Sequence, residues 1–319
     1  MLITFITGAI AMGIVFLYGC VGETITEKVG NLNLGIPGIM CLGALGGCVG
    51  VNTYFAIFGS ENIIGFFLML LAILFAMIFA ALGGLIYAVL TVSLQANQNV
   101  TGLVLTTFGV GFMKFVGARM NTSNFSIASK SIKTLFVGFE NLGWFGQIFL
   151  SYGFLVYLAF AIAIATSVIF KRTRVGLFLR AVGESPKTAD AQGINITAYK
   201  YIFILIGAAI AGIGGLYYVM DRSSGTTFTE APIESFGWMA VALVIFSVWK
   251  PNIGILGSIA FGALYILPMF IKVSNIQLKA FDMLPYAATV VVLVLTSIFG
   301  GKSIQPPASL GVNYYREDR

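Results

Sequence analysis

Long apolar runs, separated by short polar stretches, make up most of this 319-residue chain. Most of them approach or exceed the ~20 residues that a helix needs to cross a bilayer. Nine runs are apparent, at about 2–20, 34–58, 62–92, 99–116, 148–170, 201–220, 236–249, 253–271 and 284–300. The pattern predicts an all-α, polytopic transmembrane helical bundle of about 8–10 spans.

Two of the runs depart from the length of a simple span. The 62–92 run is longer than one span needs and carries Gly83-Gly84, whereas the 236–249 run is short and stops at Lys250-Pro251. A short run of this kind is typical of a half-helix or a re-entrant segment. The bundle is therefore expected to contain broken or re-entrant helices.

Two segments of the chain are similar to each other. Residues 33–45 and 252–264 align without gaps and are identical at seven of thirteen positions, including three glycines. Membrane segments rich in glycine can coincide by chance, and that alternative stays open. The other interpretation is an internal repeat in a duplicated transporter fold, in which small residues let helices approach closely.

Composition narrows the class of protein. The mean hydropathy is +0.96, 58% of residues are hydrophobic and only 9% are charged, as in a membrane protein. The chain has no histidine, and its three cysteines lie in or beside apolar runs, so neither a metal site nor a disulfide framework is indicated. A membrane enzyme or scaffold is a third alternative, for which the dispersed polar residues offer no site.

The charges of the loops predict how the chain is oriented. Residues 171–200 carry six basic and two acidic side chains, a net charge of +4, which is typical of a cytoplasmic loop. Residues 221–235 have a net charge of −2 and fit the opposite side, while 117–147, at +2, fits less well. In a single transmembrane domain covering 1–319, nine spans place the C-terminal tail, about 301–319, inside and the N-terminus outside. The excess of basic residues is explained by the bias of cytoplasmic loops toward Lys and Arg, and no nucleic-acid partner is expected.

The most polar part of this cytoplasmic loop is residues 183–194. Ser185 is a favourable N-cap, Pro186 suits the first helical position, and Gly193 suits a left-handed C-terminal cap, which together predict a short helix over 186–192. A short, capped helix in a basic loop suits docking to another protein, and the alternative is a solvated connector. Before it, apolar residues fall at helical spacing on one face: Val175, Phe178, Leu179 and Val182.

A set of residues recurs in a definite order along this loop, namely Gly176, Arg180-Ala181, Gly183-Glu184, Pro186, Ala189, Ala191 and Gly193-Ile194. The order resembles the cytoplasmic coupling loop of ABC-importer permeases of the branched-chain amino acid, ribose and nucleoside group. Further stretches resemble signatures of the nucleoside and simple-sugar branch: Gly22-Glu23, Glu27-Lys28, 30–35, 97–102, Pro307, Leu310-Gly311 and 314–317. Pro37 and Lys28 depart from the pattern, since a carboxylate and an arginine are usual there.

The resemblance implies a multi-pass permease subunit of the bacterial plasma membrane. It implies as partners a second permease subunit, ATP-binding cassette subunits that hold ATP and Mg, and an extracytoplasmic solute-binding lipoprotein, besides membrane lipid. This chain itself would bind no cofactor and would not be an enzyme. Its solutes would be nucleosides, with simple sugars as the alternative. The resemblance also implies that loop 171–200 couples the chain to an ATP-binding subunit, through Arg180, Glu184, Ser185, Pro186, Lys187, Ala189 and Gly193.

The polar residues of the spans suggest how a solute passes. Nearly all charged residues lie at span ends or in loops, where Lys114 and Arg119 are expected to extend toward the membrane interface. Coupled secondary transporters commonly carry ionisable residues inside the membrane, but a secondary transporter or channel for a small neutral solute stays the main alternative. Candidate pathway residues are Asn33, Asn97, Asn99, Thr101, Thr106, Thr107 and Phe108. Each could instead form interhelical hydrogen bonds or pack against lipid.

Overall fold

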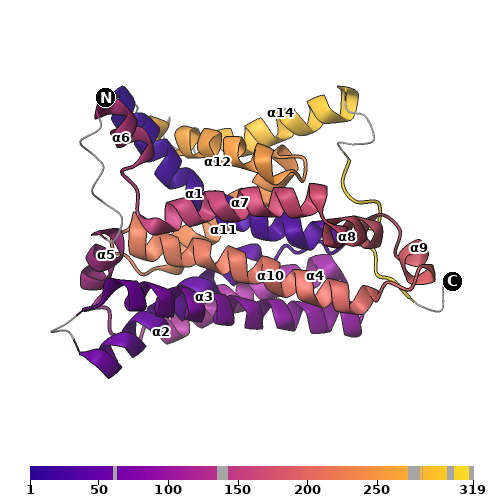
Figure 1. The fold of residues 1–319 in the computed structure, drawn as a ribbon, viewed down its shortest axis with the longest axis horizontal. Helices are drawn as coiled ribbons and strands as arrows, with labels where there is room; N and C mark the ends of the chain where they lie inside the picture. Colours follow the sequence, from indigo (N-terminus) through magenta and orange to yellow (C-terminus); the bar gives the residue numbers. More distant parts are fainter. Residues whose placement is uncertain (60–62, 135–142, 272–280, 282, 300–304, 316–319) are drawn as a thin grey trace.

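The computed structural model describes residues 1–59, 63–134, 143–271, 281, 283–299 and 305–315, which form a bundle of α-helices (Figure 1). Three short turns extend helices of the bundle, namely the π-helical turns Val89–Ser93 and Tyr218–Arg222 and the 3-10 turn Leu267–Met269. The all-α fold predicted from the apolar runs is confirmed. In chain order the helices are α1 (Leu2–Lys28), α2 (Ile36–Phe58), α3 (Gly65–Ala88), α4 (Gln98–Gly117), α5 (Phe125–Thr134), α6 (Gly143–Phe149), α7 (Phe154–Arg172), α8 (Arg174–Glu184), α9 (Pro186–Ala191), α10 (Ile196–Tyr217), α11 (Glu230–Phe246), α12 (Pro251–Ile266) and α14 (Leu284–Phe299).

Each of the nine predicted apolar runs coincides with a helix. Among the described residues, seven helical segments are long and apolar enough to cross a membrane by themselves. The other two runs form shorter helices, α11 with 17 residues and α14 with 16. The short run predicted at 236–249 belongs to α11, which starts earlier, at Glu230. The chain is thus a polytopic helical bundle with two helices shorter than a full span.

Helix α1 is longer than its apolar run predicts. The run ends at residue 20, but α1 continues to Lys28, so Glu23 and Glu27 lie inside a helix and are 0% and 3% exposed. The Glu23 carboxylate accepts a hydrogen bond from the backbone N–H of Asn33 at 3.0 Å, and Glu27 accepts one from the indole N–H of Trp249. The two carboxylates therefore satisfy donors in the turns that follow α1 and α11.

The two ends of the bundle carry different parts of the chain. Helices α8 and α9 and residues 305–315 lie at one end, whereas α5, α6 and the N-terminus lie at the other (Figure 1). The start of α1 and residues 305–315 are therefore on opposite sides, as nine crossings require. The assignment of the α8–α9 end to the cytoplasm rests on the positive charge of loop 171–200.

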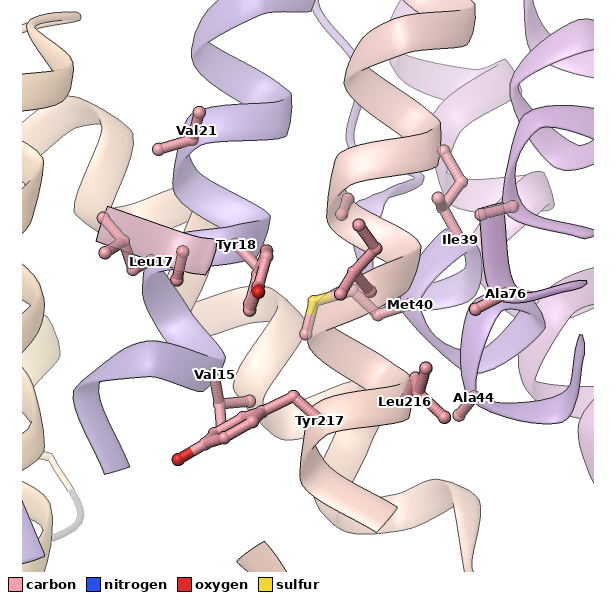
Figure 2. Close-up of a cluster of buried hydrophobic side chains, with 14 of the residues drawn as sticks. Val15, Leu17, Tyr18, Val21, Ile39, Met40, Ala44, Ala76, Leu216 and Tyr217 are labelled. Carbon is pink, nitrogen blue, oxygen red and sulfur yellow. The ribbon is translucent and has the colours of Figure 1, made fainter. Parts of the chain in front are cut away.

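Helices α1, α2 and α10 form the centre of the bundle. Tyr18 of α1, Met40 of α2 and Tyr217 of α10 belong to one buried cluster (Figure 2). The Tyr18 hydroxyl donates to the Leu155 carbonyl at 2.6 Å, and the Tyr217 hydroxyl donates to the Ala11 carbonyl at 2.8 Å. Both rings thus bury their apolar bodies without leaving a hydroxyl unpaired.

Close helix crossings in this core use positions that lack a side chain. A Cβ at Gly43 of α2 would lie 2.2 Å from the Cα of Gly212 in α10. A Cβ at Gly22 of α1 would lie 2.3 Å from the carbonyl oxygen of Gly207 in α10. Because lipid tails are as apolar as the helices, such close backbone packing is what holds the helices together.

The two similar segments each begin a helix, α2 or α12, and use aligned glycines for packing. Gly43 faces α10, whereas the aligned Gly262 faces α1, where its Cβ would lie 2.2 Å from the Ala9 carbonyl oxygen. Helix α1, which precedes α2, packs along α12, and α11, which precedes α12, packs along α2. Each of the two similar helices thus packs against the helix that precedes the other. This arrangement is consistent with an internal repeat, which stays a prediction.

Candidate functional site

The polar loop between α7 and α10 folds into two short helices, which we call the α8–α9 corner (residues 173–195). Thr173 caps α8, since its hydroxyl oxygen accepts the Gly176 N–H at 3.1 Å. Ser185 caps α9 in the same way, accepting the Thr188 N–H at 3.4 Å, and Pro186 takes the first helical position. The predicted start of the short helix is therefore confirmed.

The C-terminal end of α9 is capped by backbone hydrogen bonds. Gly193 has a φ of +81°, its N–H donates to the Asp190 carbonyl at 2.9 Å, and the Ile194 N–H donates to the Ala189 carbonyl at 3.1 Å. These bonds use carbonyls that a helix end would otherwise leave unpaired. The left-handed cap predicted at Gly193 is confirmed.

Only part of the predicted apolar face of α8 is buried. Leu179 and Val182 are buried, but Val175 is 45% and Phe178 38% exposed. Gly183 completes the buried face, because a Cβ there would lie 2.2 Å from the last carbonyl oxygen of α1. Helix α8 thus rests on the bundle along a narrower stripe than its apolar residues suggest.

The corner is held in place by the C-terminal segment, residues 305–315. The Ser309 N–H donates to the Gly183 carbonyl at 3.0 Å, and the Ser309 hydroxyl donates to the same oxygen. The Tyr314 hydroxyl donates to the Asp190 carboxylate at 2.9 Å. Both short helices are therefore bonded to residues that lie 124 to 126 positions away in the chain.

The same segment reaches the turn before α4 and, through it, the turn before α2. The side-chain amide of Asn313 donates to the carbonyls of Gln95 at 2.6 Å and Ala96 at 3.2 Å. Its oxygen accepts from the Gln98 amide at 3.0 Å, and the Gln98 oxygen accepts the Leu32 N–H at 2.8 Å. Hydrogen bonds thus connect the α8–α9 corner to the starts of two core helices.

Replacing Asn313 should loosen this connection. Asn313→Ala removes its bonds to Gln95, Ala96 and Gln98, and we expect a local loss of about 1–3 kcal/mol. Limited proteolysis of the chain in native membranes should then cut faster within 185–195. Val312→Ala, at the exposed neighbouring position, is the control. Equal cleavage rates in both variants would show that the segment does not hold the corner.

The residues predicted to contact an ATP-binding subunit divide into two groups. Pro186 and Ala189 lie on the buried side of α9, and Ser185 is the N-cap of this helix. These three shape the corner and offer little surface to a partner. The others are exposed: Arg180, Glu184, Lys187 and Gly193.

A charged cavity of about 320 Å³ lies beside the corner. Trp249 lines it, and its indole also bonds to the buried Glu27 of α1. The role of Trp249 is not predictable from sequence, because this bond joins residues 222 positions apart. The charged walls of the cavity come from Lys28, Arg180, Glu184, Lys171 and Lys250.

Two of the predicted pathway residues hold the turn before α2. Asn33 is buried, and its side-chain oxygen accepts the Gly35 N–H at 2.9 Å. The Thr106 hydroxyl of α4 donates to the Leu34 carbonyl at 2.9 Å. The Thr106 bond joins α4 to the turn before α2, as expected for the alternative of an interhelical hydrogen bond, whereas the Asn33 bond is local to the turn.

The remaining pathway candidates are spread over α4. Thr101 is buried, and Asn97 caps the helix with its side chain. Asn99, Thr107 and Phe108 are exposed. Thr107 and Phe108 lie together in a shallow hollow on the outer face of α4. The structure therefore does not gather the predicted set into one site.

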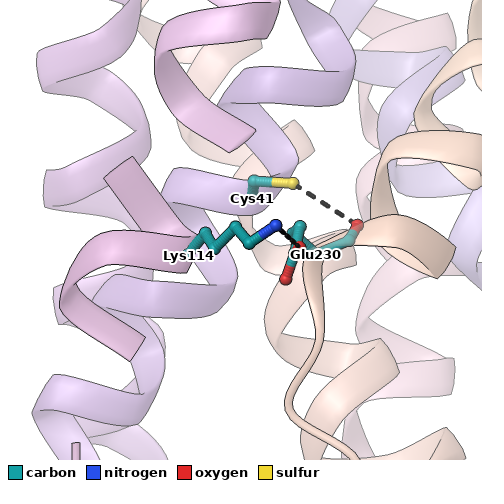
Figure 3. Close-up of polar contacts among 3 residues, drawn as sticks. All are labelled: Cys41, Lys114 and Glu230. Atoms are coloured by element: carbon teal, nitrogen blue, oxygen red, sulfur yellow. Dashed lines mark hydrogen bonds and ion pairs between the residues drawn. The ribbon is translucent and has the colours of Figure 1, made fainter. Parts of the chain in front are cut away.

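A second exposed feature lies where α4 meets α11. The ammonium of Lys114, which was expected to extend toward the membrane interface, lies 3.7 Å from the Glu230 carboxylate (Figure 3). Next to this pair is an open groove of about 620 Å³, which we call the α11 groove. It is lined by residues of α11 and α14, among them Glu234, Ser235, Trp238 and Tyr286.

Known transporter permeases are similar to this chain over most of its length. The family model described as branched-chain amino acid transport system / permease component matches residues 5–295. The nucleoside ABC transporter permease protein NupC of Lactococcus lactis subsp. cremoris is 32% identical over 310 residues, which cover 94% of this chain and 93% of that protein. The guanosine ABC transporter permease protein NupQ of Bacillus subtilis is 31% identical, over 93% of this chain and 92% of that protein. A putative glucose ABC transporter permease protein, TsgC13 of Haloferax volcanii, is 31% identical over 78% of this chain and 72% of its own length. No solved structure matches the chain.

Proposed function

The chain belongs to the family of permease components of branched-chain amino acid transport systems, and from that premise we propose that it is the membrane subunit of an ABC importer for nucleosides. The observation that carries this proposal is similarity over more than nine tenths of the chain to two permeases named for nucleoside and guanosine transport. Similarity to a glucose permease supports simple sugars as the second candidate class.

The α8–α9 corner is the surface that would meet the ATP-binding subunit. It is exposed at Arg180, Glu184 and Lys187, lies at the end of the bundle assigned to the cytoplasm, and is capped at both ends of α9. A short capped helix can transmit force because its ends do not unwind. ATP and Mg would bind the partner and not this chain.

Movement of the corner would be passed to the pathway through the C-terminal segment. Ser309 and Tyr314 bond this segment to the corner, and Asn313 bonds it to the start of α4, so a displacement of α9 is expected to shift the segment and that helix. Gln98 extends the connection to the turn before α2. A partner that binds the corner more tightly in one arrangement favours that arrangement of the bundle. A second permease subunit would complete the pathway, and a solute-binding protein would dock at the α5–α6 end.

The proposal is tested by reconstituting the chain with its partner subunits in liposomes. ATP-dependent accumulation of nucleosides, stimulated by a loaded binding protein, is expected. Uptake of nucleosides without ATP would favour a secondary transporter or channel instead. Accumulation of ribose or glucose but not nucleosides would shift the assignment to the sugar class.

A crosslinking experiment tests the contact surface. The three native cysteines are buried, so an introduced cysteine can be addressed selectively. Lys187→Cys is expected to crosslink to the ATP-binding subunit, because residue 187 lies on the exposed side of α9. Thr227→Cys, in the loop before α11 at the opposite end, is the control and should not. Crosslinking at 227 but not at 187 would reverse the assignment of the two ends.

A further inference from the structure

Helix α11 begins well inside the bundle. The carbonyl oxygen of its first residue, Glu230, lies 3.9 Å from the Cys41 sulfur of α2 (Figure 3). From Cys41, α2 continues to Phe58, which is a further distance of about 25 Å along its axis. The start of α11 therefore lies at the level of Cys41, far from the outer end of α2.

Charged groups lie exposed beside the start of α11, at the last turn of α4. The Lys114 side chain, paired with Glu230, is 75% exposed, and Glu230 is 23% exposed. A lysine and a carboxylate facing hydrocarbon would be costly, and such residues normally face a water-filled space or another protein subunit. The face shared by α4 and the start of α11 is therefore not a lipid-facing surface.

The groove face of α11 next to this pair carries polar residues near its start and, farther along, the aliphatic residues Val241, Ala242 and Ile245. Glu234, Ser235 and Trp238 fall within about one turn of each other and line the α11 groove, with Tyr286 of α14 on its other side. The groove thus combines a carboxylate, a hydroxyl and two aromatic rings. Among the described residues Glu234 forms no ion pair, so its carboxylate can accept hydrogen bonds from a solute.

We propose that the α11 groove is a nucleoside-contacting wall of the translocation pathway. The nucleobase stacks on Trp238, and the ribose hydroxyls donate to the carboxylate of Glu234. Lys114, Glu230 and Glu234 together give this wall a net charge of −1, which disfavours phosphorylated solutes and suits neutral ones. The inference rests on the proposed function and adds to it the residues that recognise the solute.

Cysteine labelling tests whether the groove is a hydrated pathway. In the assembled transporter in intact cells, Ser235→Cys should react with a membrane-impermeant maleimide, and millimolar guanosine should slow the reaction at least about fivefold. Leu256→Cys is the control: it is 71% exposed, but it lies within about two turns of the end of α12 assigned to the cytoplasm, so an impermeant reagent outside the cell should not reach it. An unreactive Ser235→Cys, or one that guanosine does not protect, overturns the inference.

Substitutions at Trp238 test the chemical class of the solute. Loss of stacking in Trp238→Ala should lower guanosine uptake about tenfold or more, and Trp238→Phe should restore most of it, because one base–aromatic stack contributes about 1–3 kcal/mol, equivalent to a factor of about 5 to 150. Ribose should not protect Ser235→Cys. Equal protection by ribose and guanosine would show that the base is not read at this wall.

The outcomes separate the two proposals. A wild-type complex that transports no nucleoside with ATP overturns the proposed function, and the inference with it. A wild-type complex that transports guanosine, together with normal uptake by Trp238→Ala, overturns the inference alone.

Discussion

Gly193→Pro is expected to lower ATP-driven uptake at least about tenfold while the chain still inserts into the membrane. Gly193 has a φ of +81°, and proline is fixed near −65°. The substitution also removes the N–H that donates to the Asp190 carbonyl at 2.9 Å. The last turn of α9 would therefore unwind, and the corner could no longer transmit movement from the ATP-binding subunit. Uptake by the reconstituted complex, measured with its ATPase activity, checks this.

Alanine and asparagine at position 193 show how much of the loss in uptake comes from backbone strain alone. A Cβ at Gly193 would meet no atom within 4 Å, so Gly193→Ala costs only the left-handed backbone, about 1–2 kcal/mol. Asparagine tolerates this conformation better, so Gly193→Asn should retain more uptake than Gly193→Ala. If the proline variant transports as the wild type does, the end of α9 has no part in coupling.

Gly43→Ala is expected to destabilise the whole bundle. The added methyl would lie 2.2 Å from the Cα of Gly212, and backbone atoms of a packed helix cannot move aside as a flexible side chain can. Separating α2 from α10 should cost about 3 kcal/mol, at the upper end of the usual range for overpacking. The apparent Tm of the purified chain in detergent, and its amount in membranes, should both fall.

The matched control for this variant is Gly111→Ala. Gly111 also lies in a helix, α4, but a Cβ there would meet no atom within 4 Å. Alanine is about 1 kcal/mol better than glycine within a helix, so this variant should be as stable as the wild type or more so. A similar fall in Tm for both variants would mean that the α2–α10 crossing is not the cause.

Short-range signals made the corner predictable from sequence. The start and end of α9 depend on Ser185, Pro186 and Gly193, whose cap geometry involves neighbours at most five positions away. The nine apolar runs likewise predicted the long helices, because the length of a hydrophobic run is set by the membrane. The apolar pattern of α8 predicted a helix but not its buried side, since that depends on which neighbours the helix meets.

Features that depend on distant contacts could not be predicted. The carboxylates of Glu23 and Glu27 looked like loop residues because the apolar run ended before them, and their partners, Asn33 and Trp249, complete the helix end only in the folded chain. The predicted pathway residues were chosen by polarity, and Asn33 and Thr106 proved to bond to backbone. The α11 groove was missed because its polar residues precede the apolar run that marked the helix.

During biosynthesis, the α8–α9 corner is made before the C-terminal segment that supports it. Tyr314 bonds to Asp190, 124 positions earlier, so at a synthesis rate of ~5–20 residues per second the corner waits about 6 to 25 s for its support. During that interval α8 and α9 are present on the ribosome-bound chain without the bonds from Ser309 and Tyr314. An ATP-binding subunit that recognises only the supported corner would assemble with finished permeases and not with nascent ones.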